Sequence, residues 1–244
     1  MPNFDAGHYL LTVFAPLRSD PVQQGDRFIS RRNALKEVLA RMPSGERSAA
    51  SYGTGVQAPF ARNRRTHFAR FVVLDYVVSN AAVNPLMKWD ETSLEDFNLL
   101  FETNVRGAWV VCTEGAKQMI REGHGGAICC VSSISAHVGA PGQTAYCGTK
   151  GAISMLAKAL ACDLGEHGIR VNAVEPGWTI TPMSAPLLDD PVVLKYYQER
   201  IPLHRGAQPE ELAAAITFLL SADASYVTAA TLLVDGGFIV NAEL

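Results

Sequence analysis

From residue 74 onward, the chain alternates short apolar runs with longer amphipathic stretches, and this alternation most limits its possible folds. The short runs are rich in β-branched residues and have the length of buried strands, whereas the longer stretches repeat apolar residues at helical spacing. Parallel strands that are joined by crossover helices produce this order. The sequence therefore predicts an α/β fold with a doubly wound parallel sheet, whose strands we expect at 74–78, 127–132, 169–175 and 231–234.

Two of the expected helices have recognisable boundary residues. Ser93 is followed three residues later by Asp96, a spacing typical of a capping box at a helix start. We expect the helix that begins there to stop near Gly123. A second helix is expected over 146–164, where apolar residues recur at helical spacing before Gly165.

Residues 1–70 do not continue this pattern and differ from the rest of the chain in charge. They hold eleven basic and five acidic side chains, whereas residues 71–244 hold ten basic and nineteen acidic ones. We expect a strand around Val13 and a helix over 31–42. A basic segment can bind phosphate or nucleic acid, but no nucleic-acid-binding motif accompanies it, so we expect no nucleic-acid partner.

Length, apolar content and cysteine usage bound the class of protein. The 244 residues, 48% of them apolar, suffice for one large domain, and we expect a single domain over 1–244. No apolar run approaches the ~18 residues that span a bilayer and no signal peptide is recognisable, so we expect a cytoplasmic protein without a membrane partner. The five cysteines are odd in number and lack metal-ligand spacing, which predicts reduced thiols and no metal site.

Tyr146 and Lys150 are the centre of the expected chemistry. They are four residues apart in a predicted helix, so their side chains emerge on the same face. An ammonium near a phenol favours the phenolate, and we therefore expect Lys150 to lower the pKa of Tyr146 from its ordinary ~10. Tyr146 would then act as general base or acid toward an alcohol or carbonyl oxygen. Taken alone, this spacing is more often an exposed helical pair.

Polar or turn-forming residues follow three of the expected strands. Asn80 follows the first strand, Ser133 the second and Pro176-Gly177 the third. Taken singly, they are a turn former, a helix cap and a simple turn. Because the carboxyl ends of parallel strands meet at the edge where open α/β sheets bind ligands, their joint placement predicts a functional site.

With these residues in place, about two thirds of the chain, from Leu74 to Asn241, resembles the short-chain dehydrogenase/reductase family. The motifs that carry the resemblance are Ser79-Asn-Ala-Ala82, Asn104, Ser132-Ser133, Tyr146-Cys-Gly-Thr-Lys150 and Pro176-Gly-Trp-Thr-Ile-Thr181. The resemblance implies a Rossmann-like domain and an oxidoreductase that moves hydride between NAD or NADP and an alcohol or carbonyl.

The resemblance also implies a role for each matching residue. Ser133 would hydrogen-bond the substrate oxygen, and Tyr146 would exchange its proton. Lys150 would bind the nicotinamide ribose and lower the tyrosine pKa, while Asn104 would hold a water that links Lys150 to solvent. The residues implied to bind the cofactor are Asn80, Ala81, Tyr146, Lys150, Pro176, Gly177, Thr179 and Thr181, with Ala82 beside them.

The sequence departs from the family pattern at two alanines and in its first third. Ala82 and Ala229 stand where the family usually has glycine, which asks for an ordinary backbone angle or a slightly wider approach. The family opens with a strand and a glycine-rich turn at the cofactor pyrophosphate, but no glycines follow the strand around Val13, and Gly53-Thr-Gly55 follows no clear strand. Residues 1–70 are either a divergent but folded first half or an aberrant stretch, such as one translated in a shifted frame; their abrupt end favours the second interpretation.

The resemblance extends to substrate and assembly. The segment 178–204 is expected to select a small-molecule substrate. It resembles bacterial sugar 1-dehydrogenases and, slightly less, 3-oxoacyl-acyl carrier protein reductases, so a sugar hemiacetal is favoured over a 3-oxoacyl thioester.

The family usually pairs the helices matching 94–119 and 146–164, which implies a homodimer or homotetramer. The rival interpretation is a non-catalytic or cofactor-defective homologue. NAD and NADP are not distinguished, because the residues that read the ribose 2′ position fall within 1–70.

Overall fold

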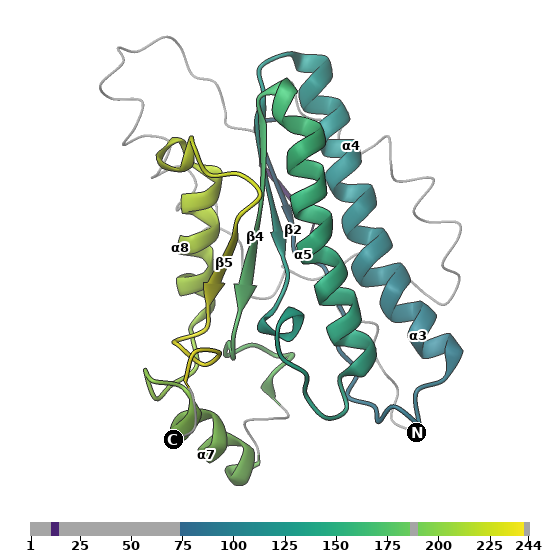
Figure 1. Ribbon diagram of the computed structural model, residues 1–244, viewed down its shortest axis with the longest axis vertical. Coiled ribbons are helices and arrows are strands. Elements are labelled where there is room, and N and C mark those ends of the chain that lie inside the picture. The colour runs from purple at the N-terminus through teal and green to yellow at the C-terminus, as the bar shows by residue number, and fades with distance from the viewer. Residues whose placement is uncertain (1–10, 15–73, 186–189, 242–244) are drawn as a thin grey trace.

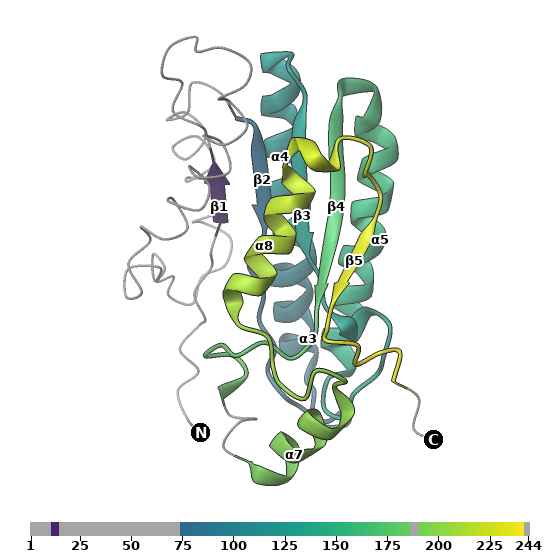
Figure 2. The ribbon, with the colours of Figure 1, turned by 90° about the vertical axis from the view of Figure 1, so that its left-hand side faces the viewer.

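The computed structural model describes residues 11–14, 74–185 and 190–241, which contain a five-stranded sheet. Its strands are β1 (Leu11–Phe14), β2 (Tyr76–Ser79), β3 (Gly126–Val131), β4 (Ile169–Pro176) and β5 (Thr231–Val234), and they lie side by side in the order of the chain (Figure 2). The strands β2 to β5 are parallel, so their carboxyl ends share one edge of the sheet. The α/β class and the four parallel strands expected after residue 74 are confirmed.

Helices cover both faces of this sheet. α4 (Gly107–Glu122) and α5 (Thr144–Leu164) lie side by side on one face, and α8 (Pro209–Leu220) lies on the other (Figure 1). Successive strand side chains point to opposite faces, so each face has its own apolar core. Val77 and Ile128 pack with α4 and α5, whereas Val78 and Cys129 pack with α8. A sheet between two helical layers is the doubly wound arrangement that the sequence predicted.

The connection from β4 to β5 differs in hand from the two connections before it. The chain passes over the same face from β2 to β3 and from β3 to β4, but α8 covers the opposite face between β4 and β5. The strand order nevertheless continues in one direction. Because the covering helix changes face while the strand order continues in the same direction, this crossover has the opposite hand to the two before it. A crossover of that hand is uncommon in parallel sheets. The helix α7 (Pro191–Arg200) belongs to this connection and lies beyond the carboxyl edge of the sheet (Figure 1).

The strand expected around Val13 is present as β1, but it runs antiparallel to β2. Leu11 lies opposite Ser79, and Phe14 lies opposite Tyr76. The carboxyl end of β1 is therefore at the edge of the sheet opposite to the carboxyl ends of β2 to β5. The chain leaves β1 on the side away from Ser133. The expected helix at 31–42 and the Gly53-Thr-Gly55 stretch lie outside the described residues.

The helix that follows β2 begins as predicted and contains one irregular turn. Ser93 caps α3 (Leu94–Leu100), and the reciprocal bonds of a capping box with Asp96 are present. Between α3 and α4 the helix widens into a π-helical turn, η1 (Phe101–Arg106), which helical spacing did not predict. α4 ends at Gly123, whose φ of 72° is the left-handed conformation that glycine adopts at low cost.

The remaining boundaries follow recognisable turn residues. α5 begins two residues before the expected start and runs into a 3₁₀ turn, η3 (Gly165–His167). The helix α7 was missed inside the expected substrate segment, although Asp190 as N-cap and Pro191 in the first turn are typical start signals. Two further 3₁₀ turns are η2 (Ile134–Ala136) and η4 (Ala222–Ala224). Across the described ranges, every helix is too short or too polar to cross a membrane.

Candidate active site

Ser133 lies where β3 leaves the sheet. The N–H of the preceding Ser132 donates to the Val174 carbonyl at 2.9 Å, which extends the pairing with β4. Ser133 then caps η2, and its Oγ accepts the N–H of Ser135 at 3.1 Å. A cap of this kind fixes the hydroxyl relative to the turn. The side chain is thus held at the carboxyl edge of the sheet, where the sequence placed it.

Tyr146 and Lys150 lie on the buried side of α5, where only 8% and 2% of each residue is exposed. The Lys150 Nζ donates to the carbonyl of Val131, the last residue of β3, at 3.0 Å. The same Nζ lies 5.5 Å from the centre of the Tyr146 ring. Their interpretation as an exposed helical pair is therefore wrong.

Burial shifts the pKa of both groups. It raises the pKa of Tyr146 to about 12, and a hydrogen bond with Ser133 acts in the opposite direction. Burial also lowers the pKa of Lys150 to about 8. The expectation that Lys150 brings the pKa of Tyr146 below its ordinary value is wrong in this structure, because the loss of hydration outweighs the interaction with Ser133, which favours the phenolate.

Asn104 is fully buried in η1 and joins three segments of the chain. Its Oδ1 accepts the N–H of Val83 at 2.8 Å, and its Nδ2 donates to the Val83 carbonyl at 3.0 Å and to Thr149 Oγ1 at 3.1 Å. Thr149 in turn donates to the Tyr146 carbonyl at 2.7 Å. Asn104 therefore fixes the segment after β2 to the turn of α5 that carries Tyr146. Both Nδ2 protons of Asn104 are thus engaged by protein groups.

The residues expected to bind the cofactor lie around this group. Asn80 and Ala81 directly follow β2, and Pro176 ends β4. The N–H of Gly177 donates to the Val234 carbonyl at 3.0 Å. An added Cβ on Gly177 would lie 2.7 Å from the Cα of Asp235, so a side chain at this position would displace backbone.

The turn after Gly177 is fixed by its own hydrogen bonds. Thr179 Oγ1 donates to the Gly177 carbonyl at 3.2 Å, and the N–H of Thr181 donates to Ser184 Oγ at 3.0 Å. Thr179 also pairs with Ala207 in an isolated parallel bridge. The contacts thus link Asn104, Ser133, Tyr146 and Lys150 into one group, and the other expected residues border it from neighbouring strand ends.

Only one of the two alanines at glycine positions adopts an unusual backbone. Ala229 has a φ of 58°, in the left-handed region, where a Cβ costs about 1 kcal/mol or more. Its expected ordinary angle is therefore wrong, whereas Ala82 keeps a negative φ. The N–H of Ala229 donates to the Val171 carbonyl at 2.8 Å, and the residue packs against the core beneath α4 and α5, which holds it in place.

The sequence analysis missed a carboxyl group beside the site. Glu175 is fully buried at the end of β4 and contacts Ser154 on α5 and His137, the residue that follows η2. The signal was present in the alternation along β4, because Glu175 continues an apolar face that packs on α5. The preceding residues of that face are Ile169, Val171 and Ala173. An ionisable residue in such a position indicates a specific role.

Known proteins match the same part of the chain. A family model described as enoyl-(acyl carrier protein) reductase matches residues 60–239. L-Rhamnose 1-dehydrogenase (NAD(P)(+)) of Sphingomonas sp. (strain SKA58) is 43% identical over 173 residues, which cover 71% of this chain and 68% of that protein. Cyclopentanol dehydrogenase of Comamonas sp. (strain NCIMB 9872) is 42% identical over 168 residues, covering 69% and 67%.

Solved structures agree with these sequence matches. A gluconate 5-dehydrogenase from Burkholderia cenocepacia J2315, crystallised with NADP and tartrate, superposes with a TM-score of 0.69 at 33% identity over 71% of this chain and 68% of that chain. The family model spans well over half of this chain, and the relatives exceed 30% identity over two thirds of it. The chain therefore belongs to the short-chain dehydrogenase/reductase family, whose members are NAD(P)-dependent oxidoreductases.

Proposed function

We propose that this chain interconverts an alcohol and a carbonyl by hydride transfer with NAD or NADP, with Tyr146 as the general acid and base. The observation that carries the proposal is the buried phenol between two polar groups. Ser133 favours the ionised form of this phenol, and the Lys150 Nζ lies 5.5 Å from its ring centre. At the carboxyl edge of a parallel sheet, such a phenol is placed to exchange a proton with the oxygen of a bound substrate.

The electrostatics support a defined role for each neighbour of Tyr146. A phenol with a pKa of about 12 holds its proton firmly, which suits donation to a carbonyl oxygen. Alcohol oxidation requires the phenolate instead, and the Ser133 hydrogen bond favours that form. Lys150, with a pKa of about 8, remains mostly charged near neutral pH and adds a positive charge on the same side.

The residues at this edge fit the nicotinamide end of the cofactor. The buried Lys150 ammonium donates to one backbone carbonyl and, among the described residues, forms no ion pair, so it has donors left for ribose hydroxyl groups. Gly177 keeps the end of β4 free of a side chain. When bound, the nicotinamide ring supplies or accepts the hydride. Thr179 and Thr181 would meet the carboxamide and pyrophosphate, and Asn80 with its neighbour Ala81 would line the adenine-ribose side.

A sugar hemiacetal is the favoured substrate class. The relatives named as L-rhamnose dehydrogenases support it, and so does an aromatic group beyond the carboxyl edge. Trp178 and Tyr197 have ring centres 5.4 Å apart, and Tyr197 stacks on Phe238 at 5.8 Å. The buried indole N–H of Trp178 has no hydrogen-bond partner in the described part of the chain. It offers a donor to a substrate hydroxyl, beside rings that suit the apolar face of a sugar. A 3-oxoacyl thioester is the alternative.

The direction of β1 favours a second candidate, a homologue with a defective cofactor site. The family's phosphate-binding turn follows a strand at the carboxyl edge of the sheet. Because β1 is antiparallel to β2, a turn directly after Phe14 starts at the opposite edge. Such a protein would keep Ser133, Tyr146 and Lys150 while binding NAD and NADP weakly.

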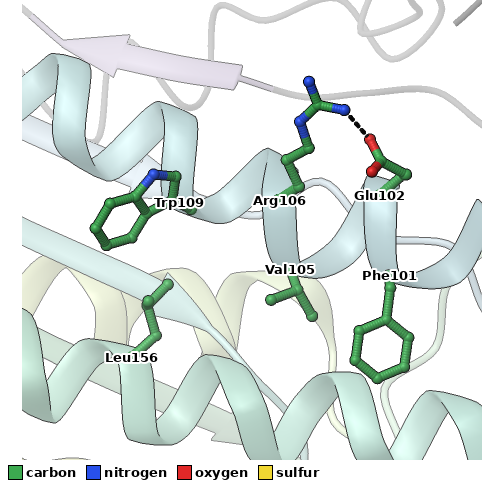
Figure 3. A pocket seen from close by; sticks show the side chains of 6 residues that line it. All are labelled: Phe101, Glu102, Val105, Arg106, Trp109 and Leu156. Atoms are coloured by element: carbon green, nitrogen blue, oxygen red, sulfur yellow. Dashed lines mark hydrogen bonds and ion pairs between the residues drawn. The ribbon is translucent and has the colours of Figure 1, made fainter. Parts of the chain in front are cut away.

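We also infer that the chain forms a homodimer or homotetramer through an apolar groove between α5 and the helix formed by η1 and α4 (Figure 3). Phe101 and Val105 point toward α5, Leu156 rises from α5, and Glu102 and Arg106 form an ion pair beside them. Trp109, which also lines the groove, is 50% exposed. Exposed apolar surface of this kind is typical of a protein interface. A second copy of the chain is the proposed occupant.

Within this proposal the chain acts as a single domain in the cytoplasm on a small-molecule substrate, without a nucleic-acid or membrane partner. The continuous family match over residues 60–239 supports one domain.

Cofactor titration tests the proposed function. Calorimetry with NAD(H) and NADP(H) should give micromolar binding, and absorbance of the reduced cofactor should report turnover of L-rhamnose ahead of an acetoacetyl thioester. Binding weaker than millimolar for both cofactors, without turnover, would select the defective homologue. The coding DNA gives an independent comparison, because a glycine-rich turn encoded in a neighbouring frame upstream of Leu74 would identify residues 1–70 as a frame artefact.

A further inference from the structure

A fully buried chain of hydrogen bonds joins the turn that carries Ser133 to the helix that carries Tyr146 and Lys150. Ser132 Oγ contacts the Lys150 carbonyl at 2.8 Å and Ser154 Oγ at 2.8 Å. Ser154 Oγ also contacts Glu175 Oε1 at 2.7 Å. The three side chains of this contact series, Ser132, Ser154 and Glu175, are at most 8% exposed, so solvent does not complete their hydrogen bonds.

The other oxygen of Glu175 is bound from the far end of the same turn. His137 Nε2 lies 2.6 Å from Glu175 Oε2. His137 directly follows η2, and Ser133 directly precedes it, so the two residues cap the two ends of this turn. Glu175 therefore holds the turn on both sides of Ser133, through Ser154 and Ser132 before it and through His137 after it.

The number of available protons determines the protonation state of the Glu175 carboxyl group. Each serine hydroxyl carries a single proton, so Ser132 and Ser154 can supply two of the three contacts among Lys150, Ser132, Ser154 and Glu175. The third proton has to come from the carboxyl group. As a carboxylic acid, Glu175 donates to Ser154, Ser154 donates to Ser132, and Ser132 donates to the Lys150 carbonyl. The Nε2–H of a neutral His137 then donates to the remaining oxygen, and every contact has its own proton.

The ionised form leaves the same contacts incomplete. A carboxylate only accepts, so Ser154 would donate to it, and the 2.8 Å contact between Ser154 and Ser132 would then lack a proton once Ser132 donates to Lys150. This would place two hydroxyl oxygens in repulsive contact inside the protein, and a protonated His137 at the other carboxylate oxygen would not supply the missing proton. Of the described ionisable groups, His137 contacts Glu175, whereas the Nζ of Lys150 is directed to the Val131 carbonyl.

We propose that Glu175, as a carboxylic acid paired with His137, is a positioning residue that fixes the η2 turn, and with it the Ser133 hydroxyl, relative to the helix that carries Tyr146. It touches neither reacting atom and acts through Ser132 and the η2 turn. The proposal rests on the proposed alcohol–carbonyl chemistry only for its kinetic consequence, because the hydrogen-bond chain exists in the unliganded protein. At position 175 the hydrogen-bond chain needs one donor and one acceptor. A carboxylic acid supplies both, and so does the primary amide of glutamine, so a glutamine substitution tests the assignment directly.

The test compares Glu175→Gln with Glu175→Leu. Glutamine keeps one donor for Ser154 and one acceptor for His137, so kcat should stay within about 3-fold of the wild type. Leucine suits the apolar face but removes both contacts, so kcat should fall on the order of 10-fold or more while the dissociation constant of the cofactor stays unchanged. Equal kcat in the leucine variant and the wild type, or equal losses in the two variants, would overturn the proposal.

Two spectroscopic readouts do not need turnover. The infrared difference between the wild type and Glu175→Gln should contain the C=O band of a carboxylic acid, and carboxylate bands alone would overturn the assignment. Amide exchange at Ser135, whose N–H donates to Ser133 Oγ, should accelerate at least ~10-fold in Glu175→Leu and stay near wild type in Glu175→Gln. If Glu175→Leu fails to fold, His137→Ala replaces it in this test, because it changes an exposed residue. Exchange of the Ser135 amide should accelerate in His137→Ala as well. Unchanged exchange in folded Glu175→Leu or in His137→Ala would contradict the positioning role, whereas absence of turnover in the wild type would contradict only the proposed function.

Discussion

The Lys150 ammonium lies 5.5 Å from the centre of the Tyr146 ring and donates to the carbonyl of Val131 at 3.0 Å. One buried charge thus connects the helical turn that carries the phenol to the end of the strand that delivers Ser133. Burial lowers the pKa of this lysine to about 8 and raises the pKa of Tyr146 to about 12. The site therefore holds both groups in environments that disfavour their charged forms, which has separate consequences for activity and for stability.

The phenol hydroxyl of Tyr146 should be required for turnover. Tyr146→Phe removes one oxygen and little volume, and loss of a proton-transfer group typically lowers the rate ~10² to 10⁴-fold. Steady-state kinetics at saturating cofactor measure the loss, and circular dichroism checks the fold. The matched control is Tyr226→Phe, at a fully exposed residue, which should leave kcat unchanged. Activity of Tyr146→Phe within a few-fold of the wild type would exclude this tyrosine as the acid and base.

The charge of Lys150 should destabilise the unliganded protein near neutral pH. In the folded state its pKa is about 8, below the ordinary 10.5, so folding disfavours the protonated form. The unfolded state binds more protons between these two values, and stability therefore rises as the pH increases from about 8 to 10.5. Below pH 8 the full cost is present, on the order of 3 kcal/mol.

Lys150→Met tests this sign while keeping the length of the side chain. The variant should unfold at a higher temperature than the wild type at pH 7, and the difference should shrink as the pH approaches 10.5. It loses the hydrogen bond to Val131, which offsets about 1 kcal/mol of the gain. Thermal unfolding at both pH values measures the effect. A variant that is less stable than the wild type at pH 7 would show that the ammonium stabilises the fold.

Removal of the Asn104 side chain should destabilise the protein as a whole. Asn104→Ala leaves the N–H and carbonyl of Val83 and the hydroxyl of Thr149 without their buried partner. Each such loss costs about 1 to 3 kcal/mol, so we expect a decrease of about 3 kcal/mol or more in the free energy of unfolding. Urea denaturation measures it. Thr149→Val removes one of these contacts only and should cost less than Asn104→Ala; the reverse order would contradict this account.

The fold after residue 74 was predictable because its signals are local. The strand runs, the capping box at Ser93 and the glycine end of α4 each act within a few residues. The π-helical turn η1 was not predictable in this way. The η1 turn carries Asn104, which makes long-range contacts with Val83 and Thr149. The spacing of residues along one helix does not predict contacts of this kind.

The candidate site, like the fold, was predictable only in part. Ser133, Tyr146 and Lys150 could be placed together because parallel strands end at one edge of the sheet and helical spacing of four puts side chains on one face. The direction of the tyrosine pKa shift was wrong, because burial depends on the packing of the whole domain. Glu175 was visible in the sequence as a carboxyl group on an apolar face, but its partners lie on two other elements.

A side chain at Gly177 should disturb the end of β4. The Cβ of Gly177→Ala would lie 2.7 Å from the Cα and 2.8 Å from the Cβ of Asp235, and a backbone neighbour gives way only if the strand end moves. We expect a loss of about 1 to 3 kcal/mol in stability and weaker cofactor binding. Gly165→Ala is the matched control, because nothing lies within 4 Å of its added Cβ and its φ is −59°. Equal stabilities of the two variants would show that the β4 end has room for a side chain.

The groove between α5 and the η1–α4 helix should be the surface that joins copies of the chain. Trp109 is 50% exposed at this groove, and Leu156 lies across from it on α5 (Figure 3). Trp109→Glu places a charge where apolar side chains would pack, and the desolvation of an unpaired carboxylate would oppose assembly. Sedimentation velocity should show a dimer or tetramer for the wild type and a smaller species for the variant. Tyr226→Glu adds the same charge at a fully exposed aromatic residue outside the groove and should leave the oligomer intact. A wild type that sediments as a monomer at micromolar concentration, or a Trp109→Glu variant that keeps the wild-type size, would mean that this groove does not bind a second copy.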